Sequence, residues 1–537
     1  MSSVAPARAG RREWIGLLVL ALPCMLYSMD LTVLHLAIPA LSRELAPSAT
    51  QLLWIIDIYG FMVAGALITM GTLGDRIGRR RVLLIGAAAF GAASILAAFS
   101  TSAEMLIATR ALLGIAGATV APSTLSLIRN MFADPRQFAT AISVWITSYS
   151  VGGAIGPLLG GALLEYFWWG SVFLVSVPVM VLLLILGPRL LPEYRDPNAG
   201  RLDLVSAGLS LVAVLALIFG LKQITLAGPS LLAGLGVVVG LVAGGAFVRR
   251  QQSLADPLID LRLFANRTFN AALLLYVVAI FISFGGFLFI PQYLQLIRGQ
   301  SPLVSGLWLV PWSLAFTVGS MLTPPLARRI RPATFMAGGL ALSALGNLLL
   351  VWVDADSSMA LIVLSTLLVG VGLAPLFTLA NEWIVGSAPP ERAGAASAVS
   401  ETGAELAAAM GIAVLGSIGT AAYRGQLATT LPADVPPASA DAARETLAAA
   451  FIVAAQIPQQ LGLDLLDAAS AAFIYGLQLT SAISAVIAAL LTVLVVVLLR
   501  SIDAGSRPQS YADQQEADAR ASREQHEAEP REVAPVA

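Results

Sequence analysis

The sequence is short of charged residues, and this shortage excludes a soluble globular protein. Only 12% of its 537 residues are charged and 58% are hydrophobic, whereas soluble domains contain about 25% charged residues. Cysteine occurs once, at Cys24, so neither an internal disulfide nor a cysteine-based metal site can form. The chain has two histidines and contains no Gly-rich phosphate loop or nucleophile elbow, which argues against an enzyme.

Long apolar runs dominate the sequence instead. A helix that crosses a bilayer needs roughly 20 mainly apolar residues, so these runs predict an all-α polytopic membrane protein with 14 transmembrane helices. A polar, basic segment (residues 1–12) precedes the first run, which lacks a small-residue cleavage site, so we expect a retained signal-anchor helix. The predicted helices cover residues 13–40, 52–73, 81–100, 104–127, 138–164, 168–191, 203–223, 229–248, 268–295, 302–327, 332–353, 359–381, 392–419 and 473–500.

The loops between these helices alternate in basic charge. One set carries 17 arginines, from Arg76 to Arg392. Because basic residues mark the cytoplasmic side, this set is predicted to be cytoplasmic, together with both termini. An even number of helices follows, which supports the count of fourteen. The opposite set carries five basic residues, namely Arg43, Lys222, Arg298, Arg424 and Arg444.

The order of the helices predicts a domain division. A six-helix bundle at residues 13–191 precedes a two-helix insert at 203–248 and a second six-helix bundle at 268–500, and two such bundles face a central cavity in many transporters. An extracytoplasmic loop, residues 420–472, interrupts the second bundle. Its periodicity allows short amphipathic helices, and a tolerated insertion is the alternative. Residues 501–537 lack apolar periodicity and are predicted to form a disordered cytoplasmic tail.

Few ionisable side chains lie inside the predicted helices, and each is a candidate for function because it costs about 2.5–3.5 kcal/mol there. Asp30 lies about 24 Å along its helix, counted from Trp14. Glu405 lies near the midplane with Glu401 one turn away on the same face, and burial favours proton uptake by both. Asp57 is near an outer helix end, whereas Glu165 and Glu382 are at interfaces and are interpreted as structural.

Arg110 is the only basic residue that we predict well inside a helix. A buried guanidinium needs acidic or carbonyl partners, so Arg110 either tunes a proton-carrying acid or ties its helix to a neighbour. His35 follows Asp30 by just over one turn. It either modulates the proton on Asp30 or serves in packing.

Several motifs together resemble the major facilitator superfamily. "GTLGDRIGRRRVL" (71–83) is similar to its signature loop, "RALLGIAGA" (110–118) to its fourth-helix motif, and "GGAIGPLLGG" (152–161) to its antiporter motif. "MDLTVLHLAIP" (29–39) and "SAVSETGAEL" (397–406) resemble the fourteen-helix drug:proton antiporters, which include quaternary-ammonium exporters. The resemblance covers residues 13–500 and implies antiport across a bacterial cytoplasmic membrane, driven by a proton gradient without a cofactor.

Two of these motifs predict a device for changing conformation. Gly71 and Gly78 allow tight turns and close helix approach, while Asp75 can cap a helix across the bundle interface and Arg76 and Arg79 can pair across it. Arg80 and Arg81 are interpreted mainly as topology signals. In the antiporter motif a glycine strip permits close packing and a proline bends the helix; these residues are Gly152, Gly156, Pro157, Gly160 and Gly161.

The predicted substrates are small lipophilic cations. A cation site needs negative charge and aromatic faces; Glu405 and Asp57 are the candidate acids, and Tyr149 and Trp312 the preferred aromatic residues. Some relatives carry extra acids where residues 302–327 have none and where Ser400 stands here, so we expect monovalent cations such as quaternary ammonium compounds and dyes. Protons and membrane lipids are the other partners; nucleic acid is not expected, and the chain is expected to be a monomer. The alternatives are a symporter, an exporter of lipids or other amphiphiles, and a membrane receptor.

Overall fold

The computed structural model is built from helices, as the apolar runs predict. It describes residues 9–195, 203–254, 257–259, 261–327, 329–387 and 393–499, within which no strand occurs. Fourteen helical segments of this part are long and apolar enough to cross a membrane, so the predicted polytopic membrane fold is confirmed. The predicted tail (501–537) and residues 1–8 of the N-terminal segment lie outside the described residues.

The helix bounds follow the predicted spans closely in most places. The α-helices are α1 Arg11–Leu45, α2 Ala49–Ile77, α3 Arg79–Ala98, α4 Ala103–Gly117, α5 Val120–Met131, α6 Pro135–Tyr166, α7 Ser171–Leu174, α8 Ser176–Leu190, α9 Leu204–Ala227, α10 Leu231–Ser253, α11 Arg267–Phe287, α12 Ile290–Gln292, α13 Pro302–Ala327, α14 Pro332–Leu350, α15 Met359–Gly386, α16 Ala393–Thr430, α17 Pro437–Glu445, α18 Leu447–Ala454 and α19 Gln459–Leu499. A 3-10 turn, η1 Leu261–Ala265, and a π-helical turn, η2 Tyr293–Ile297, complete the elements.

The predicted loop at 420–472 is largely helical, which corrects its bounds. Helix α16 continues to Thr430 and α19 begins at Gln459. The short helices α17 and α18 lie between them. Alanine is the strongest helix former, and it is abundant on both sides of the loop, so the two long helices extend past the apolar runs that hydropathy detects.

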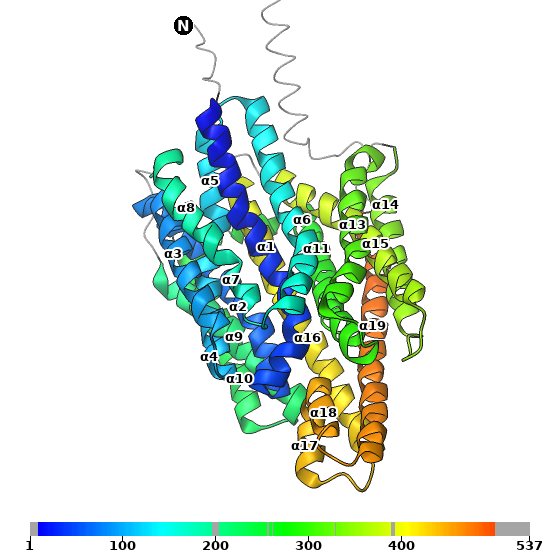
Figure 1. The fold of residues 1–537 in the computed structure, drawn as a ribbon. Coiled ribbons are helices and arrows are strands. Elements are labelled where there is room, and N and C mark those ends of the chain that lie inside the picture. The colour runs from blue at the N-terminus through cyan, green and yellow to red at the C-terminus, as the bar shows by residue number, and fades with distance from the viewer. Residues whose placement is uncertain are drawn as a thin grey trace, which may run out of the picture.

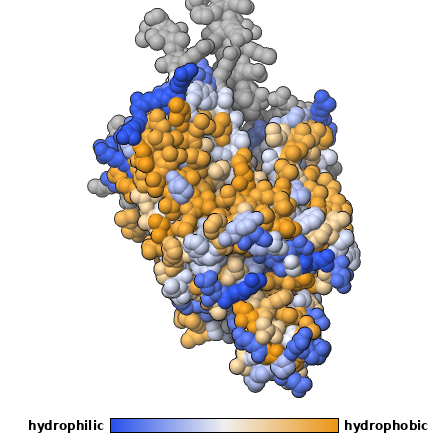
Figure 2. Space-filling view, viewed as in Figure 1, coloured by the Kyte–Doolittle hydropathy of each residue, from blue (hydrophilic) through white to orange (hydrophobic). Residues whose placement is uncertain are grey.

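The helices run side by side and form two halves (Figure 1). Helices α1–α8 pack mainly on one another, as do α11–α19. We keep the predicted division into two six-helix bundles as an interpretation of this packing. Figure 2 shows a broad hydrophobic surface across the middle of the visible face, with hydrophilic residues gathered toward both ends. Such a belt suits the hydrocarbon layer of a bilayer.

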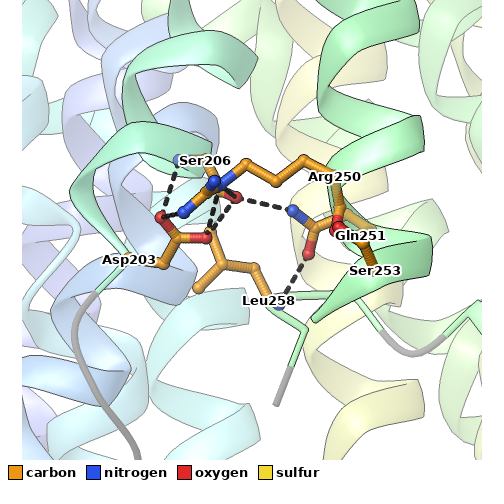
Figure 3. Close-up of polar contacts among 6 residues, drawn as sticks. All are labelled: Asp203, Ser206, Arg250, Gln251, Ser253 and Leu258. Atoms are coloured by element: carbon orange, nitrogen blue, oxygen red, sulfur yellow. Dashed lines mark hydrogen bonds and ion pairs between the residues drawn. The ribbon is translucent and has the colours of Figure 1, made fainter. Parts of the chain in front are cut away.

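The inserted pair α9–α10 packs on both halves through one helix. α9 contacts α2 and α16, whereas α10 packs on α9. The hairpin is fastened near its start by Asp203, which caps α9 through the Ser206 amide and accepts two bonds from Arg250 at 3.1 and 2.9 Å (Figure 3). Gln251 joins this network by donating to the Ser206 hydroxyl.

The two ends of the molecule differ in how the halves meet. We call the end with Arg79, Arg80, Arg81 and Arg189 the arginine-rich end and the opposite one the far end. Close contacts between the halves lie in the far half of the helices: Gly306 packs on the Pro157 carbonyl, Gly60 on Ala409, and Gln295 donates to the Leu36 carbonyl at 2.9 Å. These contacts close the far end in this conformation.

The short helices between α16 and α19 add to this closure. Glu445, at the end of α17, pairs with Arg424 of α16 at 2.5 Å. Its other carboxylate oxygen accepts a bond from the Ala49 amide, at the N-terminus of α2, at 3.0 Å. A carboxylate is favourable at a helix N-terminus, so this segment of the second half is attached to the first.

Candidate functional site

Asp30 of α1 and Arg110 of α4 form an ion pair inside the first half. Arg110 Nη1 lies 2.7 Å from Asp30 Oδ2, and the side chains are 1% and 16% exposed, respectively. The guanidinium also donates to the carbonyls of Ile55 and Ile56 in α2 and lies 4.9 Å from the Tyr59 ring centroid. Carbonyl, carboxylate and ring partners together satisfy a buried guanidinium, so Arg110 both pairs with Asp30 and ties α4 to its neighbours.

A second ion pair joins α2 to the inserted helix α9. Lys222 Nζ lies 2.6 Å from Asp57 Oδ2, and both side chains are buried. Two predictions were wrong here. The charge count places Lys222 in an outer loop and leaves Arg110 as the only basic residue deep in a helix. The structure instead has Lys222 within α9, because its apolar neighbours extend that helix to Ala227. Asp57, expected at an outer vestibule, is fully buried against this lysine.

Glu405 of α16 is in a different situation, because it has no cationic partner among the described side chains. The Tyr27 hydroxyl of α1 donates to its Oε1, while its Oε2 is buried without a hydrogen-bond partner in the described part of the chain. Glu401 lies one turn away on the same helix and is half-buried. Glu405 therefore lies where the two halves meet, with an unused acceptor oxygen.

Two chains of aromatic rings lie on either side of this carboxylate. In the first half, Tyr149 contacts both Trp145 (4.9 Å between ring centroids) and Tyr27 (5.9 Å). In the second half, Trp312 stacks on Phe316 at 6.1 Å. Further ring contacts extend this second chain through Phe377 to Tyr276 and through Phe287 to His35. Tyr149 and Trp312 thus belong to one ring chain each.

A small cavity connects several of these groups. It has a volume of about 20 Å³, room for roughly one water molecule, and its lining includes His35, Asp57, Arg110 and Glu405. The His35 ring packs edge-on against Phe287, and its Nδ1 is buried without a partner among the described residues. This cavity is too small for a drug-sized molecule, in keeping with the closed far end.

The signature loop makes contacts within the first half. Asp75 pairs with Arg79 at 2.5 Å, and within the part of the chain that the structure describes it makes no bond to the second half, where the cap was expected. Arg76 is exposed, and Gly71 lies inside α2, where it makes no turn. Gly78 does make a turn, with a φ of +116° that disfavours any side chain.

The segment after α8 packs against this loop, which sequence reasoning missed. The Glu193 carboxylate accepts a hydrogen bond from the Arg80 amide at the start of α3, and it lies 3.5 Å from the Arg80 side chain. Arg80 also donates to the Leu191 carbonyl at 2.9 Å. Arg80 is therefore more than a topology signal, since it ties α3 to the end of α8.

The antiporter motif in α6 packs closely on both halves. A β-carbon at Gly152 would overlap the Met25 carbonyl of α1, and one at Gly156 would overlap the Thr32 side chain. Gly160 lies against Val33 of α1. Gly161 faces the other way, where a β-carbon would lie 2.7 Å from the Pro302 carbonyl of α13. Together with Pro157, which packs on Gly306, the strip lets α6 contact α1 and α13 at once.

Tyr27 and Lys222 are the functional candidates that sequence reasoning missed. Tyr27 lies three residues before Asp30, so it faces nearly the same side of α1 as this acid, and that spacing was a usable signal. Lys222 lies at the end of the predicted helix 203–223, so one further helical turn would have placed it inside the membrane-spanning run. Its pairing with Asp57 joins residues far apart in the sequence, which no local pattern reveals.

Comparison with known proteins identifies the family and the relatives of this chain. The Major Facilitator Superfamily model matches residues 20–412. The multidrug efflux pump LfrA of Mycolicibacterium smegmatis is 44% identical over 480 residues, which cover 89% of this chain and 95% of that protein. The methyl viologen resistance protein SmvA of Salmonella typhimurium is 35% identical over 465 residues, which cover 86% of this chain and 94% of that protein.

Solved structures share the fold. A crystal structure of a bacterial homologue of the human lysosomal transporter Spinster, in an inward-facing and unoccupied conformation, superposes with a TM-score of 0.65 at 18% identity. The match covers 91% of this chain and 98% of that one. Fold, motifs and relatives agree that this chain is a multi-pass membrane transporter, not an enzyme, and that it belongs to the Major Facilitator Superfamily.

Proposed function

We propose that the chain is a multidrug efflux pump of the cytoplasmic membrane that exports lipophilic, mainly monovalent cations in exchange for protons. The observation that carries this proposal is Glu405, whose Oε2 is buried without a partner in the described part of the chain. An unpaired buried carboxylate must take up a proton or another cation, because a lone buried charge is too costly. The names of the relatives LfrA and SmvA favour drugs as the cargo.

The cation would bind between the halves at Glu405. The Tyr27 ring is held against this carboxylate by the hydrogen bond from its hydroxyl, and Tyr149 packs on Tyr27. Aromatic faces attract quaternary ammonium groups, which cannot donate hydrogen bonds to a carboxylate. The ring chain that includes Trp312 and Tyr276 would supply the opposite wall once the halves separate.

The proton would be carried by Asp30, with Arg110 as its switch. In the present conformation the Asp30 carboxyl group lies 2.7 Å from the Arg110 guanidinium, which is its counter-ion. If the arginine-rich end is cytoplasmic, as the charge asymmetry predicts, closure of the far end makes this the state that releases protons to the cytoplasm. Protonation of Asp30 from outside would free Arg110 from its partner, and Glu401 would share proton uptake with Glu405.

Competition then couples the two flows. Facing the cytoplasm, ionised Glu405 binds the substrate cation. Facing outward, protons neutralise the carboxylates and the cation leaves, because one buried carboxylate cannot hold both. The strip from Gly152 to Gly161 would be the surface along which α6 moves, and the Asp75–Arg79 pair would open and exchange partners as the arginine-rich end closes.

The experiment is transport by the full chain in proteoliposomes with an imposed pH gradient. We expect ethidium efflux that depends on the gradient, and its loss in Glu405→Gln and Asp30→Asn. Methyl viologen, a dication, belongs in the same assay, because it tests the preference for monovalent cations. Pumping by both variants at the wild-type rate would refute the assignment of these acids. Movement of a fluorescent lipid without movement of any lipophilic cation would instead favour a lipid exporter.

A further inference from the structure

The only lysine in the sequence is Lys222, and it is buried inside the membrane-spanning region. Its side chain is 2% exposed and that of Asp57 is fully buried. Its ammonium nitrogen lies 4.2 Å from the centroid of the Trp54 ring. The other 30 basic residues are arginines, so an amine occurs here and on no other side chain.

The surroundings of the Lys222 ammonium are those of a site for a foreign cation. A buried carboxylate and an indole face are both groups that attract organic cations in proteins. An ammonium has three N–H donors, yet neither it nor the two Asp57 oxygens make a hydrogen bond of regular geometry with the described residues. A buried ion pair whose remaining donors are unmet is held weakly, so the lysine is a replaceable occupant.

An apolar cavity adjoins this pair and offers room for the rest of a ligand. It has a volume of about 100 Å³ and lies between α9 and α16. A cavity of about 150 Å³ accommodates a benzene ring, so an aryl group fits after a modest adjustment. The cavity is lined by Ile218, Leu221, Lys222, Ala413, Val414 and Ile418.

We propose that Asp57 and Trp54 form a second site for lipophilic monovalent cations, which Lys222 fills as a tethered cation until a substrate displaces it. This inference rests on the proposed function and adds a site on the side of α2 that faces α9. Around Asp57 stand Lys222 from α9, Arg110 from α4, Glu405 from α16 and His35 from α1. When a monovalent cation replaces the lysine ammonium, the buried net charge is unchanged. Replacement by a dication would add one buried positive charge.

A displaced Lys222 side chain can extend to the membrane interface at the far end of α9. Lys222 lies five residues before Ala227, the last residue of α9, and so about 7.5 Å from the far end of that helix. A lysine side chain is long enough to extend its ammonium to a membrane interface over such a distance. The helix itself stays in place because the Asp203–Arg250 network fastens its other end.

Amine labelling of the wild-type protein tests the exchange directly, since the chain has one side-chain amine. The purified full chain is treated with a membrane-permeant acylating reagent, with and without tetraphenylphosphonium, and modification of the Lys222 peptide is followed by mass spectrometry. We expect slow labelling without ligand and at least about a fivefold faster rate at saturating ligand. Asp57→Asn, which removes the partner of the lysine, should label fast without ligand.

Three controls make the result decisive. Trp54→Leu should reduce the effect of the ligand on labelling, whereas the exposed Trp352→Leu should not. Triphenylphosphine oxide, a neutral compound with similar aryl rings, should not accelerate labelling; acceleration by it would attribute exposure to a conformational change and overturn the proposal. Binding of tetraphenylphosphonium is measured in parallel. Saturation without faster labelling refutes the second site alone, whereas absence of any cation binding refutes the proposed function.

Discussion

The buried acids of this transporter fall into two groups that differ in their partners. In the first half, Asp30 is paired with Arg110 and Asp57 with Lys222 of the inserted helix. In the second half, Glu405 is bonded to the Tyr27 hydroxyl and has no cation beside it in the described structure. The paired acids have a counter-ion from the protein itself, whereas Glu405 has a mobile cation or proton as its counter-charge when it is neutralised.

Because their partners differ, the paired and unpaired acids are suited to different roles. A built-in counter-ion keeps a carboxylate ionised and fixes its position, which suits tying helices together or switching with a defined partner. An unpaired carboxylate in a low-dielectric setting is neutral only with a proton or a ligand cation bound. We therefore propose Glu405 as the group at which proton and substrate compete, and Asp30 as the group whose ion pair with Arg110 changes during the transport cycle.

The largest expected effect comes from removing the cation of a pair. Arg110→Gln leaves Asp30 without its counter-ion and should destabilise the fold by about 3 kcal/mol or more. Thermal unfolding of the purified protein in detergent measures this loss. The matched double variant, Asp30→Asn with Arg110→Gln, removes both charges and should recover much of the stability. Equal unfolding temperatures for single and double variants would contradict the pairing.

The next effect concerns the unpaired acid. Glu405→Gln removes the charge offered to the substrate and should weaken tetraphenylphosphonium binding by roughly 10- to 100-fold, the equivalent of 1.5–3 kcal/mol. Its stability should change little, since no ion pair is broken. Glu401→Gln, one turn away, is the control and should weaken binding less. Calorimetric titration measures the affinity of each variant for tetraphenylphosphonium. A larger loss of affinity in Glu401→Gln than in Glu405→Gln would show that Glu401 is the main binding acid.

A smaller effect is expected from the phenol that supports Glu405. The Tyr27 hydroxyl donates a hydrogen bond to the Glu405 carboxylate and thereby stabilises its ionised form. Tyr27→Phe removes this hydroxyl. A hydrogen bond of this kind contributes about 1 kcal/mol, so cation affinity near pH 7 should fall about fivefold. Tyr59→Phe is the matched control, because the buried Tyr59 hydroxyl has no partner among the described residues. Similar losses in both variants would show that the hydrogen bond is unimportant.

The smallest effect concerns a paired acid outside the membrane-spanning segments. The bonds from Arg250 and Ser206 lower the pKa of Asp203 to about 2. Because this pKa lies below that of an unfolded aspartate, near 3.9, the stabilisation is present above about pH 4 and is lost as the pH falls toward 2. Asp203→Asn keeps a capping oxygen but removes the charge that pairs with Arg250, and should cost up to about 1 kcal/mol at pH 6. A cost that is equally large at pH 2.5 would contradict this account.

The sequence predicts the transmembrane helices better than it predicts the ion pairs between them. Hydropathy finds fourteen helices because each apolar run is long enough to cross a bilayer by itself. It misses the ends of α16 and α19, since their Ala-rich extensions are helical without being strongly apolar. For Arg110 the sequence predicts an acidic or a carbonyl partner without choosing between them, and the structure gives it both.

Lys222 illustrates what cannot be read from sequence. Counting basic residues on each side of the membrane places a lysine near a helix end in a loop by default. Its burial depends on α2, which brings Asp57 and Trp54 to the same point. The Tyr27–Glu405 bond likewise joins the two halves of the chain, and it exists only in conformations where α1 and α16 meet.

The central claim is that substrate cation and proton compete for Glu405, and proton release tests it most directly. Tetraphenylphosphonium is added to the purified protein in weakly buffered solution near neutral pH, and the pH change is recorded. We predict proton release by the wild type that disappears in Glu405→Gln and persists in the control variant Tyr59→Phe. Saturating cation binding without proton release by the wild type, or unchanged release by Glu405→Gln, would contradict the account.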